Sequence, residues 1–187
     1  MKTTHKLSIK EVAPNFSFAM NKDCAISRIK YLADSNIDFD VYLKTKGCNL
    51  QRPFVWTLLQ KQQLILAIFK ENPIPKMCVI EHDPDGTEKN KVYQIIDGKQ
   101  RLNAMLSFYR GEFPIEVNGE EFYYDDLDGN LQMRIRTYQP KADIGYSYHD
   151  DEISDDVKIA WFDLVNFAGT QQDLDHMKMI KSLGKKD

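Results

Sequence analysis

Apolar and polar residues alternate along the first half of the chain in patterns that predict a helix followed by short strands. Residues 21–33 have apolar side chains at helical spacing, which predicts a short helix. Residues 37–43 alternate strictly, as a half-buried strand does. Residues 77–81 and 91–96 are apolar runs on either side of a turn rich in Asp and Gly, and they predict a hairpin.

A more strongly apolar segment follows Thr57, a residue type that can cap a helix. Its apolar side chains cover most of the circumference of a helix, and only Gln60, Gln63 and Lys70 indicate a polar side. We therefore expect this helix to be deeply buried. It should end at residues 72–75, which contain two prolines, because proline cannot continue a helix.

The next segment predicts another helix and a second hairpin. Residues 102–109 place apolar side chains at i, i+3, i+4 and i+7, which is one face of a helix. Gly111 is a suitable C-terminal stop for it. Residues 112–124 are expected to form a hairpin that turns at an Asn-Gly pair.

Toward the C-terminus the pattern is less decisive. Residues 132–138 fit either a short helix or a strand, and residues 139–150 indicate a loop. Ser154 and the two aspartates after it suit the start of a helix, through capping and through the helix dipole. We expect that helix to end near Gly169 and a last helix to span residues 172–183.

These elements fit a single domain over residues 1–187. Within it we expect an extended lead-in over residues 1–20 and a C-terminal helical part over residues 151–187. Helices and short antiparallel strands fall in separate blocks, which predicts the α+β class. No apolar run is long enough for a transmembrane helix or a signal peptide, so we expect a cytoplasmic protein with no membrane partner.

Composition and charge add two constraints. Cys24, Cys48 and Cys78 are widely spaced without a Cys-x-x-Cys pair, which argues against a zinc knuckle or a thioredoxin-type site and fits a reducing compartment. The net charge of -3 divides into +6 over residues 1–111 and -9 over residues 112–187. A phosphate-bearing ligand would favour the first part, whereas a protein that coats DNA needs a strongly basic surface.

The segment Asp97-Gly98-Lys99-Gln100-Arg101 stands where a strand is expected to end and a helix to begin. The first N–H groups of a helix lack intrahelical partners and carry partial positive charge, so phosphate binds there readily. Gly98 would let a ligand approach the backbone. Arg101 could grip phosphate bidentately, Lys99 could act as a point charge, and Asp97 could hold magnesium or a ribose hydroxyl.

A second interpretation of this segment needs no ligand. Asp97 and Gln100 stand in the spacing of a capping box, Asp-x-x-Gln, and an aspartate cap would occupy an N–H group that phosphate needs. Spacing alone favours this structural interpretation. Arg52, held beside Pro53 ahead of a predicted helix, is a weaker candidate for contact with a ligand. The four histidines are too scattered to propose a metal site.

Several blocks follow one another in an order that resembles one protein family. They are Gln51-Arg52-Pro53-Phe54-Val55-Trp56, Asn72-Pro73-Ile74-Pro75, Ile96-Asp97-Gly98-Lys99-Gln100-Arg101-Leu102 and Val165-Asn166-Phe167-Ala168-Gly169-Thr170. The family is the N-terminal domain of GmrSD-type restriction endonucleases, related to the ParB/sulfiredoxin-like fold. Its pattern is approximately Gln-Arg-Pro-(aromatic)-x-Trp, Pro-Ile-Pro, Asp-Gly-Gln-Gln-Arg and Asn-x-Gly-Gly-Thr. The resemblance covers roughly residues 45–180.

This resemblance implies a small mixed sheet with packed helices, and a domain that binds and hydrolyses a nucleoside triphosphate in bacterial defence against foreign DNA. Carried over position by position, it implies catalytic roles for Asp97, Gln100 and Arg101, with Asp97 also holding Mg²⁺. The residues that it marks for nucleotide or phosphate binding are Arg52, Gly98, Lys99, Arg101 and Asn166.

The sequence departs from the family pattern in places that leave alternatives open. Lys99 replaces the first Gln of the motif, which keeps hydrogen-bond donors but loses the acceptor, and Ala168 replaces a Gly. No counterpart of the HNH nuclease domain of many relatives is present, so we expect no autonomous DNA cleavage, and a partner nuclease subunit would be needed. The alternatives are a non-catalytic DNA-binding or regulatory module and a degenerate scaffold in which Asp97 only caps a helix.

Overall fold

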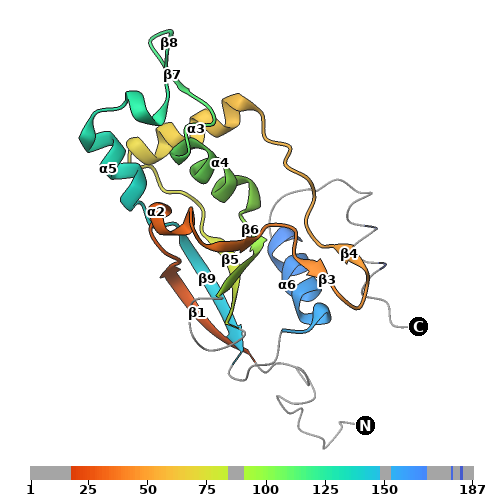
Figure 1. Ribbon diagram of the computed structural model, residues 1–187. Coiled ribbons are helices and arrows are strands. Elements are labelled where there is room, and N and C mark those ends of the chain that lie inside the picture. The colour runs from red at the N-terminus through yellow and green to blue at the C-terminus, as the bar shows by residue number, and fades with distance from the viewer. Residues whose placement is uncertain (1–17, 84–90, 148–152, 168–177, 179–181, 183–187) are drawn as a thin grey trace, which may run out of the picture.

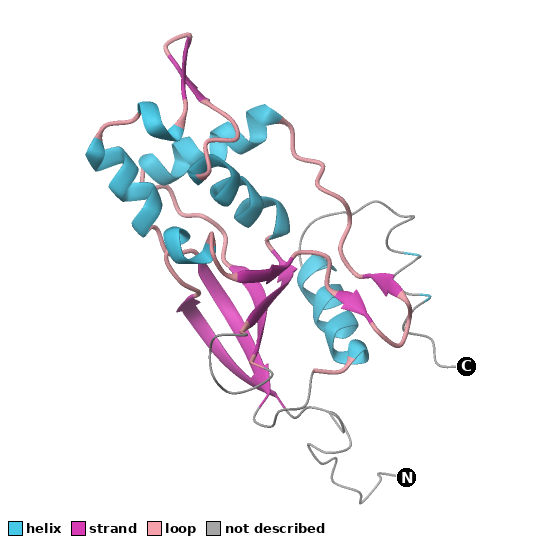
Figure 2. Cartoon of the chain, viewed as in Figure 1, coloured by secondary structure: helices cyan, strands magenta, loops and turns pink. Residues whose placement is uncertain are grey.

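The computed structural model describes residues 18–83, 91–147 and 153–167, together with Lys178 and Ser182. Over this part of the chain the protein has the α+β fold that the sequence predicts (Figures 1 and 2). The strands are β1 (Phe18–Ala25), β2 (Asn36–Asp38), β3 (Tyr42–Leu43), β4 (Cys48–Asn49), β5 (Met77–His82), β6 (Val92–Asp97), β7 (Ile115–Val117), β8 (Glu120–Phe122) and β9 (Lys141–Ser147). The helices are α2 (Ile29–Leu32), α3 (Leu58–Phe69), α4 (Lys99–Tyr109), the short 3₁₀ helix η1 (Tyr124–Asp126), α5 (Gly129–Thr137) and α6 (Asp155–Phe167).

A mixed five-stranded sheet in the order β1-β9-β5-β6-β2 forms the centre of the domain. β9 pairs antiparallel with β1 and parallel with β5, β5 pairs antiparallel with β6, and β6 pairs parallel with β2. β3–β4 and β7–β8 are separate two-stranded hairpins. The predicted hairpin of residues 77–81 and 91–96 is confirmed as β5 and β6.

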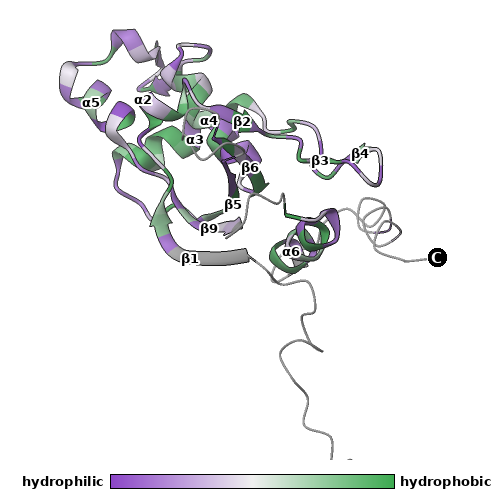
Figure 3. Ribbon diagram, turned by 60° about the horizontal axis from the view of Figure 1, so that its bottom comes forward, coloured by the Kyte–Doolittle hydropathy of each residue, from purple (hydrophilic) through white to green (hydrophobic). Residues whose placement is uncertain are grey.

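Both faces of this sheet are buried, because side chains of one strand alternate between two cores. Met77 and Val79 of β5 join the larger core, which α2, α3, α4 and α5 cover, whereas Cys78 and Ile80 join a smaller core against α6. Figure 3 shows α6 on the far side of the sheet from α3 and α4, with green and purple residues on different sides of the helix. The smaller core is the one that lies beside the candidate site.

The predicted helix after Thr57 is confirmed as α3, but its deep burial is not. A complete capping box forms, in which Thr57 accepts from Gln60 N and the Gln60 side chain accepts from Thr57 N. Only one side of the helix is buried, however, and Leu58 and Leu59 are 47% and 61% exposed. The first turn of α3 extends past the core, so the apolar residues there face outward.

Two sequence predictions are wrong because strand pairing overrides local pattern. Residues 21–33, expected to be one helix, form the end of β1 and the four-residue helix α2. Residues 139–150, expected to be loop, contain β9. β1 and β9 pair with each other from Phe18↔Ser147 to Ala25↔Lys141. Neither strand is specified by its own sequence alone, because each is stabilised by hydrogen bonds to a distant partner.

Other predicted elements are confirmed or refined. The hairpin of residues 112–124 is β7–β8, and Asn118 and Gly119 have the positive φ angles of 54° and 83° that its turn needs. Residues 132–138, which fitted helix or strand, are the end of α5. The single strand predicted over residues 37–43 is split into β2 and β3 around Val41, which has φ 51°.

The remaining predictions lie partly outside the described residues. These are the lead-in over 1–20 before Phe18, the end of α6 near Gly169, and the helix over 172–183 except for Lys178 and Ser182. The helix expected after Ser154 is confirmed as α6, with Asp155 and Asp156 in its first turn. Among the described residues, no helix is long and apolar enough to cross a membrane.

Candidate functional site

A pocket of about 120 Å³ lies where β6, α4, α6 and the segment between β4 and α3 meet. Its lining residues are Gln51, Arg52, Trp56, Asp97, Gly98, Lys99, Gln100, Arg101, Phe162 and Asn166. Every residue to which the sequence assigned a role in catalysis or phosphate binding is in this group. Segments that are far apart along the chain therefore converge on one place.

The start of α4 forms one wall of the pocket and has no side-chain cap. The N-cap residue is Gly98, with φ 102°, and the Asp97 side chain does not cap the helix. A Cβ atom at Gly98 would lie 2.5 Å from Met77 Cγ, so the position also requires glycine for space. The structural interpretation of the Asp-x-x-Gln spacing is therefore wrong, because no side chain in the part of the chain that the structure describes caps the first N–H groups of α4.

Gln100 holds the neighbouring segment in place instead of capping the helix. Its Oε1 accepts hydrogen bonds from Val55 N at 3.1 Å and Trp56 N at 3.2 Å, and its Nε2 donates to Pro53 O at 3.0 Å. All of these bonds go to backbone atoms of residues 53–56. Gln100 thus fixes the path of the chain beside the pocket.

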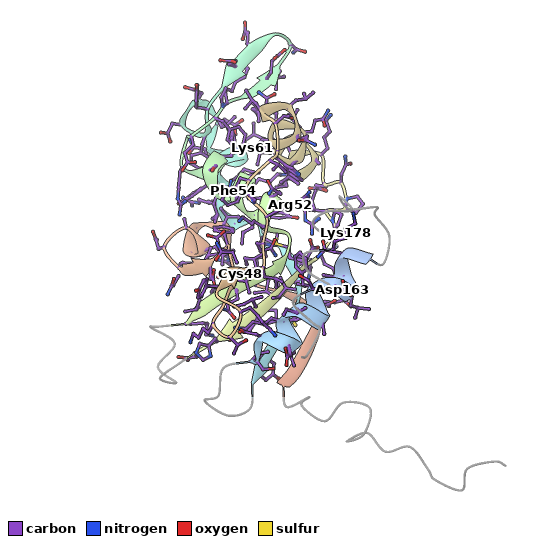
Figure 4. All side chains as sticks on the ribbon, turned by 90° about the vertical axis from the view of Figure 1, so that its right-hand side faces the viewer. Cys48, Arg52, Phe54, Lys61, Asp163 and Lys178 are labelled. Carbon is purple, nitrogen blue, oxygen red and sulfur yellow. The ribbon has the colours of Figure 1, made fainter. Side chains whose placement is uncertain are left out.

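Gln51 fixes the other end of this segment and places Arg52. Its Nε2 donates to Ile95 O and Ile96 O, both at 2.7 Å, which ties the segment to β6. Arg52 is exposed, and no described residue forms an ion pair or hydrogen bond with its guanidinium. Figure 4 shows Arg52 on the side of the segment toward α6 and Phe54 on the other side. Arg52 is therefore available to a ligand in the pocket.

Arg101 and Asp97 form an ion pair across the start of α4. Arg101 Nη2 lies 2.9 Å from Asp97 Oδ2 and also donates to Lys76 O at 3.2 Å. Arg101 Nε is buried and finds no acceptor among the described residues. A buried donor without an acceptor is uncommon in proteins, and this N–H is therefore a candidate donor to a ligand or a water molecule.

Lys99 lines the pocket and forms an ion pair with Asp40. Its Nζ lies 2.7 Å from Asp40 Oδ1 and 4.5 Å from the centre of the Phe54 ring, and its side chain is only 4% exposed. Asp40 could not be predicted from the sequence, because nothing in the chain around it resembles a motif. The pairing arises only from the fold, which brings the β2–β3 loop against the start of α4.

α6 contributes one apolar and one polar side chain to the pocket, those of Phe162 and Asn166. Phe162 is 5% exposed, and Asn166 Nδ2 donates to Phe162 O at 2.8 Å one turn earlier in the helix. Trp56, from the segment before α3, also lines the pocket. Gln51 and Trp56 belong to the block of residues 51–56 that resembles the family pattern. Nothing in the sequence around Phe162 marked it as a site residue, apart from its place on an apolar helix face.

No metal centre is preformed in the part of the chain that the structure describes, since no group of three His, Cys, Asp or Glu side chains could hold an ion there. Asp97 is the carboxylate that lines the pocket. One carboxylate fits a magnesium ion that is held mainly by ligand phosphates and water. Arg101 bonds to Asp97 Oδ2, and no described residue bonds to Oδ1.

Cys78 lies opposite Asp97 in the β5–β6 pairing but is not a nucleophile. Burial raises the pKa of its thiol to about 12, and the negative charges of Asp97 and Asp143 act in the same direction. The thiol is protonated at neutral pH and therefore unreactive. Cys24, Cys48 and Cys78, which all lie among the described residues, form no disulfide.

Comparison with known proteins identifies a family but no characterised relative. The family model for the N-terminal domain of the GmrSD restriction endonuclease matches residues 49–183, which include every residue that lines the pocket. No curated protein and no solved structure matches the chain. The chain therefore belongs to the family of GmrSD restriction endonuclease N-terminal domains, and its function is related to that of restriction endonucleases.

Proposed function

We propose that this domain binds the phosphates of a nucleoside triphosphate in the pocket at the start of α4 and hydrolyses it in the course of defence against foreign DNA. The observation that carries the proposal is the uncapped first turn of α4, which lies beside Arg52 and Arg101. Free helix N–H groups and two guanidinium groups form a site for an anion. A polar pocket of this kind does not suit an apolar ligand.

The size of the pocket indicates which part of the nucleotide enters it. Pockets that enclose a whole ligand of nucleotide size have volumes of roughly 300–1,000 Å³. The pocket here has about 120 Å³, which suits a phosphate group. The ribose and base would then lie across the rim, where Trp56 offers an aromatic surface.

Each residue can be given a role on the basis of its contacts. Arg52 would bind phosphate directly, because it has no other partner among the described residues. Arg101 would donate to phosphate while keeping Asp97 in place. Gln100 would act by positioning, since its amide is used to hold residues 53–56. Asn166 would contact the ligand from α6.

Hydrolysis would depend on Asp97, the carboxylate in the pocket. Asp97 would hold a magnesium ion bound to the nucleotide or orient the attacking water. Magnesium, when bound, would neutralise charge on the phosphates. Arg101 would stabilise the charge that develops as the terminal phosphate leaves.

The proposal can be tested by calorimetric titration of the protein with each of the four ribonucleoside triphosphates, with magnesium and with chelator. We expect at least one to bind to the wild type and to bind much more weakly to Arg52→Ala and Arg101→Ala. Lys61→Ala, which removes a half-buried cation of α3 outside the pocket, is the matched control. Absence of binding by all four nucleotides in both conditions would refute the proposal.

A DNA-binding role is the outcome to exclude in the same series. Duplex DNA would be titrated at several salt concentrations, because affinity that rests on phosphate contacts falls steeply as salt rises. DNA affinity that is lost in Arg52→Ala, without nucleotide affinity in the wild type, would favour the DNA-binding module instead.

A further inference from the structure

The pair of Asp40 and Lys99 is built into the fold beside the pocket. Lys99 is a cation with 4% exposure, and the 58% exposed carboxylate of Asp40 is 2.7 Å from it. The Phe54 ring covers the ammonium group at 4.5 Å. An ammonium group in this position keeps little water, so it depends on Asp40 for compensation of its charge.

The loop that carries Asp40 is held in a defined conformation. The carboxylate of Asp38 accepts hydrogen bonds from Asp40 N at 3.0 Å and Val41 N at 2.8 Å, and it also accepts from Gln94 Nε2 at 3.1 Å. Val41 is fully buried and has φ 51°, an unfavourable angle for a β-branched residue. Gln51 N donates to Asp40 O at 3.1 Å. These contacts direct Asp40 toward Lys99 and make the pair a fixed feature.

Two ion pairs compensate much of the positive charge of the side chains that line the pocket. Asp40 neutralises Lys99, and Asp97 neutralises Arg101. Among the described residues that line the pocket, Arg52 is then the cation that no carboxylate opposes. A free triphosphate carries about four negative charges at neutral pH, which exceeds what this arrangement can balance. A triphosphate that has bound a divalent cation carries about half of that charge.

We propose that Asp40 is a specificity-determining residue, which acts through Lys99 so that the site accepts a triphosphate complexed with a divalent cation and discriminates against the free one. This inference rests on the proposed function of the pocket. Asp40 does not touch the ligand. It compensates the charge of the Lys99 ammonium group, which is then not available to the phosphates of the ligand.

The test compares the affinity of the full chain for a nucleoside triphosphate in magnesium with its affinity in chelator. In Asp40→Asn, Lys99 loses its counter-ion and can bind the ligand, so we expect affinity for the metal-free triphosphate to rise about tenfold, with a smaller change for the magnesium complex. Asp34→Asn is the matched control, because Asp34 is also exposed and lies outside the pocket.

A second background shows whether Asp40 acts through Lys99. In Lys99→Gln the ammonium group is absent, so we expect Asp40→Asn to have no further effect on the ratio of the two affinities. Metal-free inorganic triphosphate, titrated in parallel, should show the same gain in Asp40→Asn, because the effect concerns charge and not the base.

The outcomes separate the two proposals. If the wild type binds nucleotide but Asp40→Asn leaves the ratio of affinities unchanged, or changes it equally in Lys99→Gln, the role of Asp40 is wrong and the nucleotide site stands. If neither nucleotide nor inorganic triphosphate binds to any variant, both proposals fail. Thermal unfolding of each variant shows that the measured protein is folded.

Discussion

The starts of α3 and α4 differ in how they treat the N–H groups of the first helical turn, which have no partner within the helix. At α3, Thr57 and Gln60 form a complete capping box, and the turn needs nothing further. At α4, a similar pair of residues, Asp97 and Gln100, stands at the same spacing, yet neither caps the helix. Asp97 pairs with Arg101, and Gln100 bonds to residues 53–56.

The difference shows that the type and spacing of two residues do not determine whether they cap a helix. At α4 the N-cap residue is Gly98, with φ 102°, and the Asp97 carboxylate lies 2.9 Å from Arg101 Nη2, one turn further along the chain. The side chains that would have served as caps are used to shape a pocket. The uncapped start of α4, which lines a pocket, is therefore a stronger indication of a ligand site than the capped start of α3.

The largest effect is expected when the turn at α4 is disturbed. Gly98→Ala would place a Cβ atom 2.5 Å from Met77 Cγ and force alanine to adopt φ 102°. We expect the free energy of unfolding to fall by about 3 kcal/mol, measured by urea denaturation.

Gly111→Ala is the control for this substitution. Gly111 also has a positive φ angle, of 70°, but a Cβ atom there would meet nothing within 4 Å. Its loss should be about 1 kcal/mol, from backbone strain alone. Equal losses in the two variants would show that contact with Met77 does not constrain the α4 start.

A smaller effect on stability, together with an effect on ligand binding, is expected for Gln100→Ala. The substitution removes the bonds to Pro53, Val55 and Trp56 that hold the segment carrying Arg52. We expect a loss of about 1–2 kcal/mol in unfolding free energy. Affinity for the nucleotide should fall about tenfold, measured by titration calorimetry, because Arg52 is less well positioned.

Gln63→Ala provides the comparison, since Gln63 is an exposed glutamine on α3 outside the pocket. It should leave both stability and affinity unchanged. If Gln100→Ala kept full affinity, the segment would not need its support, and the positioning role would be wrong.

At α3 the corresponding change should affect stability only. Thr57→Ala removes the capping box, which we expect to lower the unfolding free energy by about 1 kcal/mol. Thr57→Ser keeps a hydroxyl and should restore most of that loss. Nucleotide affinity should be the same in all three proteins, and a drop in Thr57→Ala would mean that the two helix starts are not independent.

The smallest effect at neutral pH is expected from Cys78, which lies beneath the α4 start in the sheet. Burial and nearby carboxylates raise its pKa from 9.0 to about 12, so the folded protein keeps the thiol proton where the unfolded chain has lost it. Folding is therefore favoured fully below pH 9, and this contribution is lost as pH rises toward 12.

The measurement is the difference in unfolding free energy between the wild type and Cys78→Val. We expect it to be constant from pH 6 to about pH 8 and to shift against the wild type above about pH 9. A difference that does not vary up to about pH 11 would show that the thiol is not held protonated beside Asp97.

Much of the site could be predicted from the sequence, since its residues stand in short blocks with a recognisable order. The pattern of α4 and the strand before it placed Asp97 and Arg101 at a strand-to-helix junction, and this is confirmed. What the sequence could not give is which partner each side chain selects. Asp40 lies in a loop without any motif, and it pairs with Lys99, which is 59 positions away in the sequence.

The fold shows the same division between local and distant determinants. Elements with a clear period and a cap or turn of their own, such as α3 and the β7–β8 hairpin, could be predicted with nearly correct bounds. β1 and β9 could not, since each is stabilised by pairing with strands that are distant in sequence. The exposure of Leu58 and Leu59 was missed because periodicity does not show how far a helix extends beyond the core.

The central position of β9 has a consequence for how the chain acquires its structure. β9 is the last strand in sequence among the described residues, yet it lies between β1 and β5 in the sheet. As the chain leaves the ribosome, β5 can pair with β6, but β1 and the other edge of β5 stay unpaired until residue 147 has emerged. Pairings so distant in sequence slow folding. We therefore expect the nascent chain to stay open, and prone to wrong pairing, until β9 has emerged.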